Sequence, residues 1–146
     1  MNLVRVLRLL ITAEIAFVLI GVVAGVLLRD TLPALLQQYL ALEADRAWSG
    51  LDFLKSVSYL VAFGLLIAGW IGLWKLKPWS RLVYTAAWIL SVLVLPMVGP
   101  AVLHGVEYML GDIATLAAGM TLALIWLSPL AVHFSPKPPD SSAQDC

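Results

Sequence analysis

The chain has 146 residues, of which 62% are hydrophobic and only 12% are charged, and its formal net charge is zero. Soluble domains average about 45–50% apolar and about 25% charged residues, so this composition leaves too little polar surface to cover a soluble globule. The absence of a net charge also provides no overall field that would recruit nucleic acid. We therefore expect an all-α membrane protein that does not bind nucleic acid.

The first predicted helix covers residues 4–28. Its apolar run is long enough to cross about 30 Å of hydrocarbon at about 1.5 Å per residue, and we interpret it as a retained span and not as a cleaved signal. At about 100° per residue, Glu14, Gly21 and Gly25 fall on one narrow stripe. The two glycines form a GxxxG pair, which allows close packing of a neighbouring helix. We therefore expect Glu14 to face that neighbour and not lipid.

A second, shorter helix is expected over residues 31–46. Its leucines and Tyr39 recur at helical spacing, and the segment is too short to cross a bilayer. This pattern is typical of an amphipathic helix that lies on the membrane or caps a bundle. Ser49 and Asp52 then fit the capping box that opens the next helix.

Three further spans are predicted at residues 51–76, 79–98 and 111–133. In the first of them, Gly64, Ala68 and Gly72 form a second stripe of small residues for helix packing. Short links favour a four-transmembrane-helix, up-down-up-down bundle over residues 1–134, with the amphipathic helix outside the membrane. The tail, residues 135–146, is polar and rich in proline, so we expect it to be disordered and cytoplasmic.

The turn between the second and third spans fixes the predicted orientation. Cations beside indoles at the end of an apolar run are typical of a membrane–water interface, and basic short loops are typical of its cytoplasmic side. With the N-terminus inside, six basic residues lie on the cytoplasmic side and three on the other, which places both termini in the cytoplasm. The residues expected to anchor this turn, or to bind anionic lipid headgroups, are Trp70, Trp74, Lys75, Lys77, Trp79 and Arg81.

Two resemblances add expectations to this reading. The sequence from Trp70 to Tyr84, with its Lys-Pro-Trp-Ser-Arg turn, resembles small four-span bacterial membrane proteins that are largely uncharacterised. That resemblance implies a four-helix fold and a bacterial inner membrane. Ala13-Glu14 also resembles the early glutamate of the small multidrug resistance transporters, which would give Glu14 a shared proton and cation-substrate role. The long link after the first span departs from that family, so the second resemblance concerns Glu14 alone.

Glu14 is the main candidate site residue. A charge at the bilayer centre costs about 2.5–3.5 kcal/mol on insertion scales, so an acid retained there needs a reason. It is either a proton or substrate site within the bundle, or a structural acid that is hydrogen-bonded to a neighbouring helix or snorkels to the cytoplasmic edge. His104 and Glu107 form a pair too sparse for metal binding, which needs three or four converging ligands.

The remaining residues do not predict catalysis. The serines of the spans have no histidine at a suitable depth, and no phosphate-binding or metallohydrolase motif is present. We therefore expect no enzyme activity, no metal and no cofactor.

The sequence favours a non-catalytic integral membrane protein with an accessory, subunit or lipid-interacting role. The alternative is a small proton-coupled transporter of cationic or lipophilic compounds that uses Glu14 and acts as a homo-oligomer. The expected partners are membrane lipids and either a second copy of the chain or a larger membrane complex. The GxxxG stripe would pack within one chain or between two chains.

Overall fold

The computed structural model describes residues 2–44, 49–94, 96 and 103–134. Within these residues the chain is helical and contains no strand. The predicted disordered tail, residues 135–146, lies outside the described residues. The α-helices are α1 (Leu3–Leu27), α2 (Ala34–Ala44), α3 (Gly50–Trp74), α4 (Ser80–Val94) and α5 (Gly105–Leu127), and the 3₁₀ helices are η1 (Arg29–Thr31) and η3 (Pro129–Phe134).

Three helices, α1, α3 and α5, are long and apolar enough to cross a membrane. Such helices are what a multi-pass membrane protein requires. The all-α class and three candidate spans are therefore confirmed among the described residues. The apolar helix α4 has 15 residues, about 22 Å, which is less than the thickness of a hydrocarbon core. The predicted span at 79–98 extends past it, but residues 95 and 97–98 lie outside the described residues. The fourth span and the up-down-up-down bundle therefore stay predictions.

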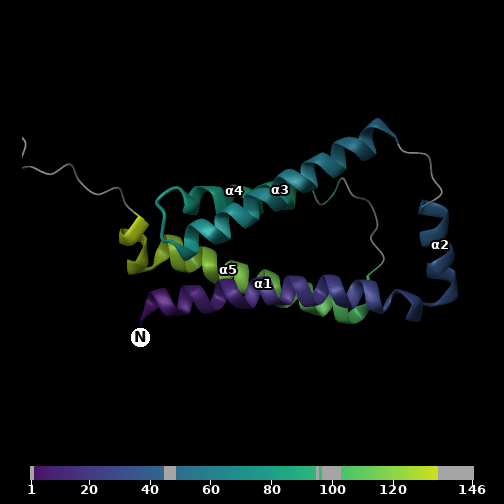
Figure 1. The fold of residues 1–146 in the computed structure, drawn as a ribbon, viewed down its shortest axis with the longest axis horizontal. Coiled ribbons are helices and arrows are strands. Elements are labelled where there is room, and N and C mark those ends of the chain that lie inside the picture. Colours follow the sequence, from purple (N-terminus) through teal and green to yellow (C-terminus); the bar gives the residue numbers. More distant parts are fainter. Residues whose placement is uncertain (1, 45–48, 95, 97–102, 135–146) are drawn as a thin grey trace, which may run out of the picture.

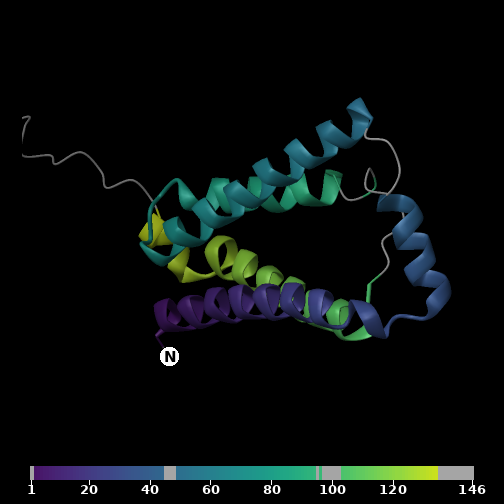
Figure 2. The ribbon, with the colours of Figure 1, turned by 45° about the vertical axis from the view of Figure 1, so that its right-hand side comes forward.

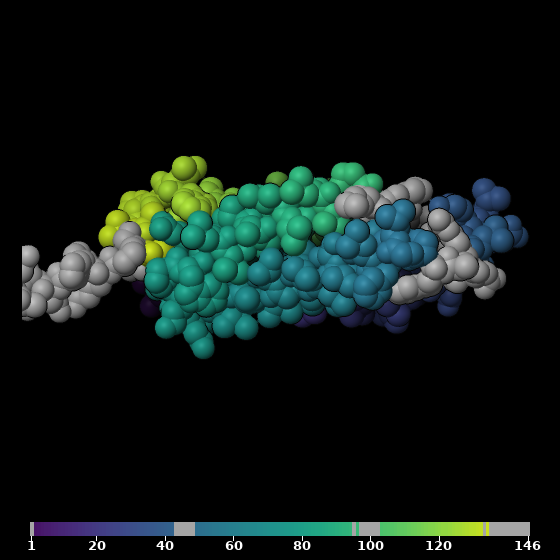
Figure 3. All heavy atoms as spheres, turned by 90° about the horizontal axis from the view of Figure 1, so that it is seen from above, coloured from purple at the N-terminus to yellow at the C-terminus, as the bar shows by residue number. Residues whose placement is uncertain are grey.

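The long helices are arranged as two pairs. Helix α1 packs mainly on α5, and α3 packs mainly on α4, whereas contacts between the pairs are few (Figure 1). The pairs meet at the end of the molecule that holds the N-terminus, the 75–79 turn and η3, which we call the closed end. They diverge toward the end that holds α2, which we call the open end (Figure 2). A space-filling view from the α3–α4 side shows these two helices lying along each other, with η3 and α2 at opposite ends (Figure 3).

The helix boundaries follow local capping chemistry. The predicted capping box is confirmed, since Ser49 and Asp52 satisfy each other's backbone N–H groups at the start of α3. The helix that contains the last predicted span, 111–133, has different bounds at both ends. Helix α5 begins at Gly105 because the His104 side chain accepts a hydrogen bond from the Val106 N–H. It ends at Leu127, and the chain continues from Pro129 as the 3₁₀ helix η3 because proline cannot continue the α-helical hydrogen bonds.

The predicted helix 31–46 is shorter in the structure. Helix α2 starts at Ala34, directly after Pro33, and residues 45–46 lie outside the described residues. Its leucines do not all face one side, because Leu36 and Leu40 are half-buried whereas Leu35 and Leu42 are exposed. The helix joins the ends of α1 and α3 at the open end of the molecule (Figure 1).

The turn between α3 and α4 closes with a Schellman motif. The Lys77 N–H donates to the Gly72 carbonyl at 2.9 Å, and the Leu76 N–H donates to the Leu73 carbonyl at 3.1 Å. Leu76 occupies the left-handed position of this motif with φ of 53°, where glycine is usual. Its side chain packs against the buried core, which offsets the backbone strain.

Small residues allow close approach within each pair. The GxxxG stripe packs inside the chain, because a Cβ on Gly21 would meet Leu110 at 3.7 Å and one on Gly25 would meet the Glu107 carboxylate at 2.8 Å. Both neighbours belong to α5. Of the two alternatives that the sequence allows, packing within one chain and packing between two chains, the structure shows the first.

The small residues of α3 that face α4 are not the row that the sequence indicated. A Cβ on Gly69 would lie 3.0 Å from the Tyr84 Cα, and one on Gly72 would lie 2.6 Å from the Ser80 Cβ. Gly64 is exposed with nothing within 4 Å of such a Cβ, and Ala68 is only half-buried. The α3–α4 contact therefore uses Gly69 and Gly72, and of the predicted row only Gly72 belongs to its close approach.

We expect Gly72→Ala to destabilise the protein, because the added methyl group cannot fit between α3 and the Ser80 side chain. Overpacking of this kind costs about 1–3 kcal/mol. Gly64→Ala, on the same helix but in open space, is the matched control and should leave the unfolding midpoint unchanged or slightly raised. Thermal unfolding in mild detergent, followed by circular dichroism, measures both. Equal midpoints for the two variants would contradict the observed α3–α4 packing.

Candidate functional site

Glu14 is buried on α1, with 1% of its surface exposed, on the same face as Leu7 and Ile11. This position agrees with the packing face that its stripe with Gly21 predicts. Its carboxylate Oε2 accepts a hydrogen bond from the Tyr84 hydroxyl of α4 at 2.7 Å. Because α1 belongs to one helix pair and α4 to the other, this bond joins the two pairs.

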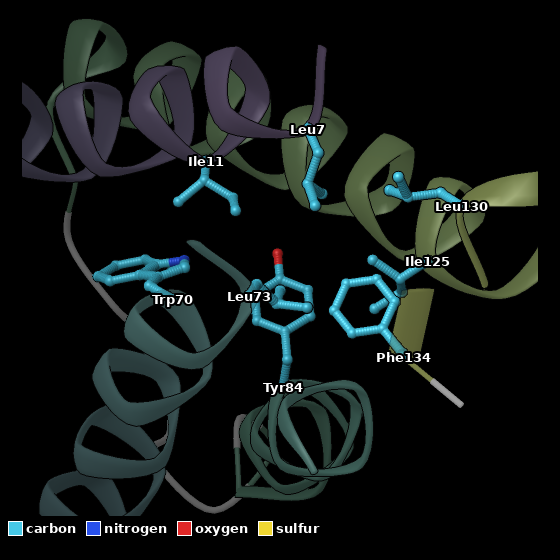
Figure 4. Packing of buried hydrophobic residues seen from close by; sticks show 8 residues of the cluster. All are labelled: Leu7, Ile11, Trp70, Leu73, Tyr84, Ile125, Leu130 and Phe134. Carbon is cyan, nitrogen blue, oxygen red and sulfur yellow. The ribbon is translucent and has the colours of Figure 1, made fainter. Parts of the chain in front are cut away.

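Two indole groups complete the surroundings of the carboxylate. Trp70 on α3 and Trp88 on α4 are neighbours of Glu14. Neither N–H makes a hydrogen bond of standard geometry within the described residues, and Glu14 Oε1 has no such partner either. Figure 4 shows the Tyr84 hydroxyl directed toward α1, between Leu7 and Ile11, and the Trp70 nitrogen directed toward the same space.

This arrangement surrounds one carboxylate with hydrogen-bond donors. An indole N–H can only donate, and the Tyr84 hydroxyl donates to Glu14. Thr121 on α5 also lies near Tyr84, but its own hydroxyl donates to the Ala117 carbonyl at 2.9 Å. The groups that surround the carboxylate therefore suit a hydrogen-bond acceptor better than a cation.

A cluster of apolar side chains surrounds this site at the closed end. Its buried members come from α1, α3, α4, α5 and η3, and the ring of Tyr84 is one of them (Figure 4). In low-dielectric surroundings a hydrogen bond to a carboxylate is strong and an unmade one is costly. The buried residues of the cluster are Leu7, Ile11, Trp70, Leu73, Tyr84, Ile125, Leu130 and Phe134.

The predicted interface residues separate into two groups. Trp70, expected to anchor at the interface, is buried instead, with 7% of its surface exposed. Trp74, Lys75, Lys77 and Trp79 are exposed at the closed end, as interface anchors would be.

Arg81 and Arg8 both contact aromatic rings at the closed end. The Arg81 guanidinium lies 4.9 Å from the centre of the Trp126 ring and 5.8 Å from that of Phe134. It also donates to the Ala131 carbonyl at 3.4 Å, so Arg81 ties α4 to the end of α5 and to η3. The Arg8 guanidinium lies 5.6 Å from the centre of the Trp74 ring.

Sequence reasoning missed Tyr84, Trp88 and Thr121 as neighbours of the acid. A usable signal was present, since Tyr84 and Trp88 are four residues apart and so share one face of a helix. Aromatic residues with a polar group usually find a partner when they are buried. A buried acid on one span therefore predicts a polar aromatic partner on another span.

At the open end, the polar residues do not form a comparable site. His104 caps α5, the Glu107 carboxylate lies against Gly25, and Asp112 is exposed. Among the residues that the structure describes, no group of three His, Cys, Asp or Glu side chains is placed to hold a metal ion.

Comparison of the chain with protein-family models, with curated proteins and with solved structures finds no match. The functional argument therefore starts from the geometry of the site itself.

We expect Tyr84→Phe to destabilise the protein, because the ring stays in the core while Glu14 Oε2 loses its donor. Leaving a buried acceptor unsatisfied costs about 1–3 kcal/mol. Tyr59→Phe is the control, since Tyr59 is 40% exposed on α3, and it should leave stability unchanged. The measurement is the thermal unfolding midpoint in mild detergent. A Tyr84→Phe protein as stable as the control would argue against the role of this hydrogen bond.

Proposed function

We propose that the protein is a non-catalytic, four-span integral membrane protein with an accessory, subunit or lipid-interacting role. The observation that carries this proposal is the hydrogen bond from the Tyr84 hydroxyl to the buried Glu14 carboxylate, which joins the two helix pairs. In this arrangement the acid holds two helix pairs together. A structural role thus accounts for a residue that would otherwise be costly in the membrane.

The same geometry gives less support to a transporter of cationic compounds. A site for an organic cation or a metal ion requires acceptors or aromatic faces turned toward the ligand. Here the nearest polar groups are donors, and one oxygen of Glu14 is already occupied by Tyr84. Proton-coupled transport through Glu14 remains the second hypothesis, because a buried acid is the group that such a mechanism uses.

The hydroxyl groups of the spans support a non-catalytic role. An activated nucleophile needs an adjacent base within hydrogen-bond reach. Each of the serines considered as candidates donates instead to a backbone carbonyl four residues earlier in its own helix. These serines are Ser56, Ser58, Ser91 and Ser128.

The proposed membrane arrangement has both termini in the cytoplasm and the closed end on the cytoplasmic side. The excess of basic residues at that end and the tryptophans beside it support this orientation. The extensive packing of α4 against α3, across one short turn, supports α4 as the fourth span despite its length. The resemblance of the Trp70–Tyr84 sequence to small four-span bacterial proteins supports a bacterial inner membrane.

An oligomer would have to use faces other than the GxxxG stripe, which is occupied by α5. Gly64 and Ala68 are available on α3 for contact with a second copy or with a partner in a larger membrane complex. We include such an assembly in the proposal because an accessory subunit needs a partner.

Single-cysteine labelling tests the topology, with Cys146 first replaced by serine. We expect Pro78→Cys to react only from the cytoplasmic side, because it lies in the basic turn. Thr31→Cys and Leu103→Cys should both react only from the opposite side, since one follows α1 and the other follows α4. Labelling of position 103 from the cytoplasm would rule out α4 as a span, and labelling of position 78 from outside would invert the orientation.

Proton release separates the two functional hypotheses. We expect detergent-solubilised protein to release no protons when lipophilic cations are added, because Glu14 is held by Tyr84 and enclosed by the core. The measurement is the pH change in weakly buffered solution, with Glu14→Gln as the control once its helicity and monodispersity match those of the wild type. Release from the wild type that is absent in Glu14→Gln would favour the transporter instead.

A further inference from the structure

An open groove lies between α1 and α3 close to the closed end of the molecule. Its volume is about 200 Å³, and its walls are Ile11, Ile15, Trp70, Ile71, Trp74 and Lys75. Helices α1 and α3 make few contacts with each other, so the groove lies where the two helix pairs meet without packing tightly. In the proposed membrane arrangement this groove faces the hydrocarbon of the cytoplasmic leaflet.

Two cations stand at the rim of this groove. Lys75 lines it with the apolar part of its side chain, and the Arg8 guanidinium lies over the ring of Trp74, another of its walls. Both side chains are exposed, and the one ion pair found among the described residues, Lys55–Asp52, is at the other end of α3. The rim of the groove therefore carries positive charge that nothing within the described chain neutralises.

The surroundings reinforce this charge. The structure places the first turns of α1, with Arg5 and Arg8, at the same end as the turn that carries Lys75 and Lys77 (Figure 1). Together with Arg81 these make five basic residues, which falls in the range of about 4–8 that is typical of anionic-lipid recognition. The acid nearest to them in sequence is Glu14, and it is buried and bound to Tyr84. An anion is the ligand that this end of the molecule would attract.

We propose that the groove between α1 and α3 binds one anionic phospholipid, with its acyl chain along Ile15 and Ile71 and its phosphate between Arg8 and Lys75. This inference rests on the proposed membrane orientation and names the ligand of the lipid-interacting role. A phosphate alone would use the cations but not the apolar walls. A lipid uses both, and a tryptophan at the headgroup level is the residue that membrane interfaces favour.

The energetics predict selectivity by headgroup charge. Within a bilayer an acyl chain is surrounded by apolar atoms whether it is bound or free, so the groove walls contribute shape and little driving force. A basic residue near an anionic membrane surface contributes about 1 kcal/mol, which corresponds to roughly a fivefold change in affinity for each of Arg8 and Lys75. Binding should therefore distinguish anionic from zwitterionic lipids of the same chain length, and it should weaken at high salt.

The test uses full-length protein in a neutral detergent. Dioleoyl phosphatidylglycerol, dioleoyl phosphatidylcholine and inorganic phosphate are added separately, and bound lipid is counted by native mass spectrometry alongside the thermal midpoint. We expect one retained phosphatidylglycerol and a raised midpoint, with neither effect from phosphatidylcholine or phosphate. Equal retention of phosphatidylcholine, or the same stabilisation by phosphate alone, would overturn the proposal.

Matched variants locate the site. The double variant Arg8→Gln/Lys75→Gln should lower the affinity for phosphatidylglycerol by roughly 25-fold, the product of two fivefold losses. The control double variant Arg5→Gln/Lys77→Gln removes the same charge away from the groove and should lower this affinity less. Ile71→Trp fills the groove without changing any charge and should also reduce retention. Equal losses for the two double variants would overturn a defined groove in favour of a diffuse basic field.

The labelling of positions 78 and 103 reports on the membrane orientation separately, so failure of either proposal can be recognised.

Discussion

The hydrogen bond between Tyr84 and Glu14 is the contact on which the arrangement of the helices depends. It links residues 70 positions apart in the chain and belongs to the small set of contacts that join the α1–α5 pair to the α3–α4 pair. In a membrane, helices gain no hydrophobic free energy by associating, so close packing and polar contacts must hold them together. The structure uses glycines within each pair, and at the closed end it joins the pairs through this carboxylate, the contacts of Arg81 and the apolar cluster.

The aromatic residues at the closed end have two different roles that depend on depth. Trp70 and Trp88 lie near the buried Glu14, whereas Trp74 and Trp126 lie beneath the guanidinium groups of Arg8 and Arg81. An indole presents a donor at its edge and negative charge density on its face. The same side chain can therefore offer a donor to a buried acceptor and the face of its ring to a cation at the surface.

Much of the fold, and part of the site, could be predicted from the sequence. The apolar runs give the three long helices, the Ser49–Asp52 capping box gives the start of α3, and a helical stripe places Glu14 on a packing face. The partners of Glu14 could not be predicted, because helical periodicity says which side of a helix is buried but not which helix covers it. Periodicity also failed to choose between Gly64 and Gly69 on α3, since small residues occur on more than one side of that apolar helix.

The pairing of the first long helix with the last has a consequence for biosynthesis. Helix α1 leaves the ribosome well before α5, and Glu14 is made before Tyr84, so in the growing chain the acid has neither its packing partner nor its donor. Helices α3 and α4 are adjacent in sequence and can associate as soon as both have been made. The contact between α1 and α5 can therefore form only after most of the chain has been made, whereas the contact between α3 and α4 can form earlier.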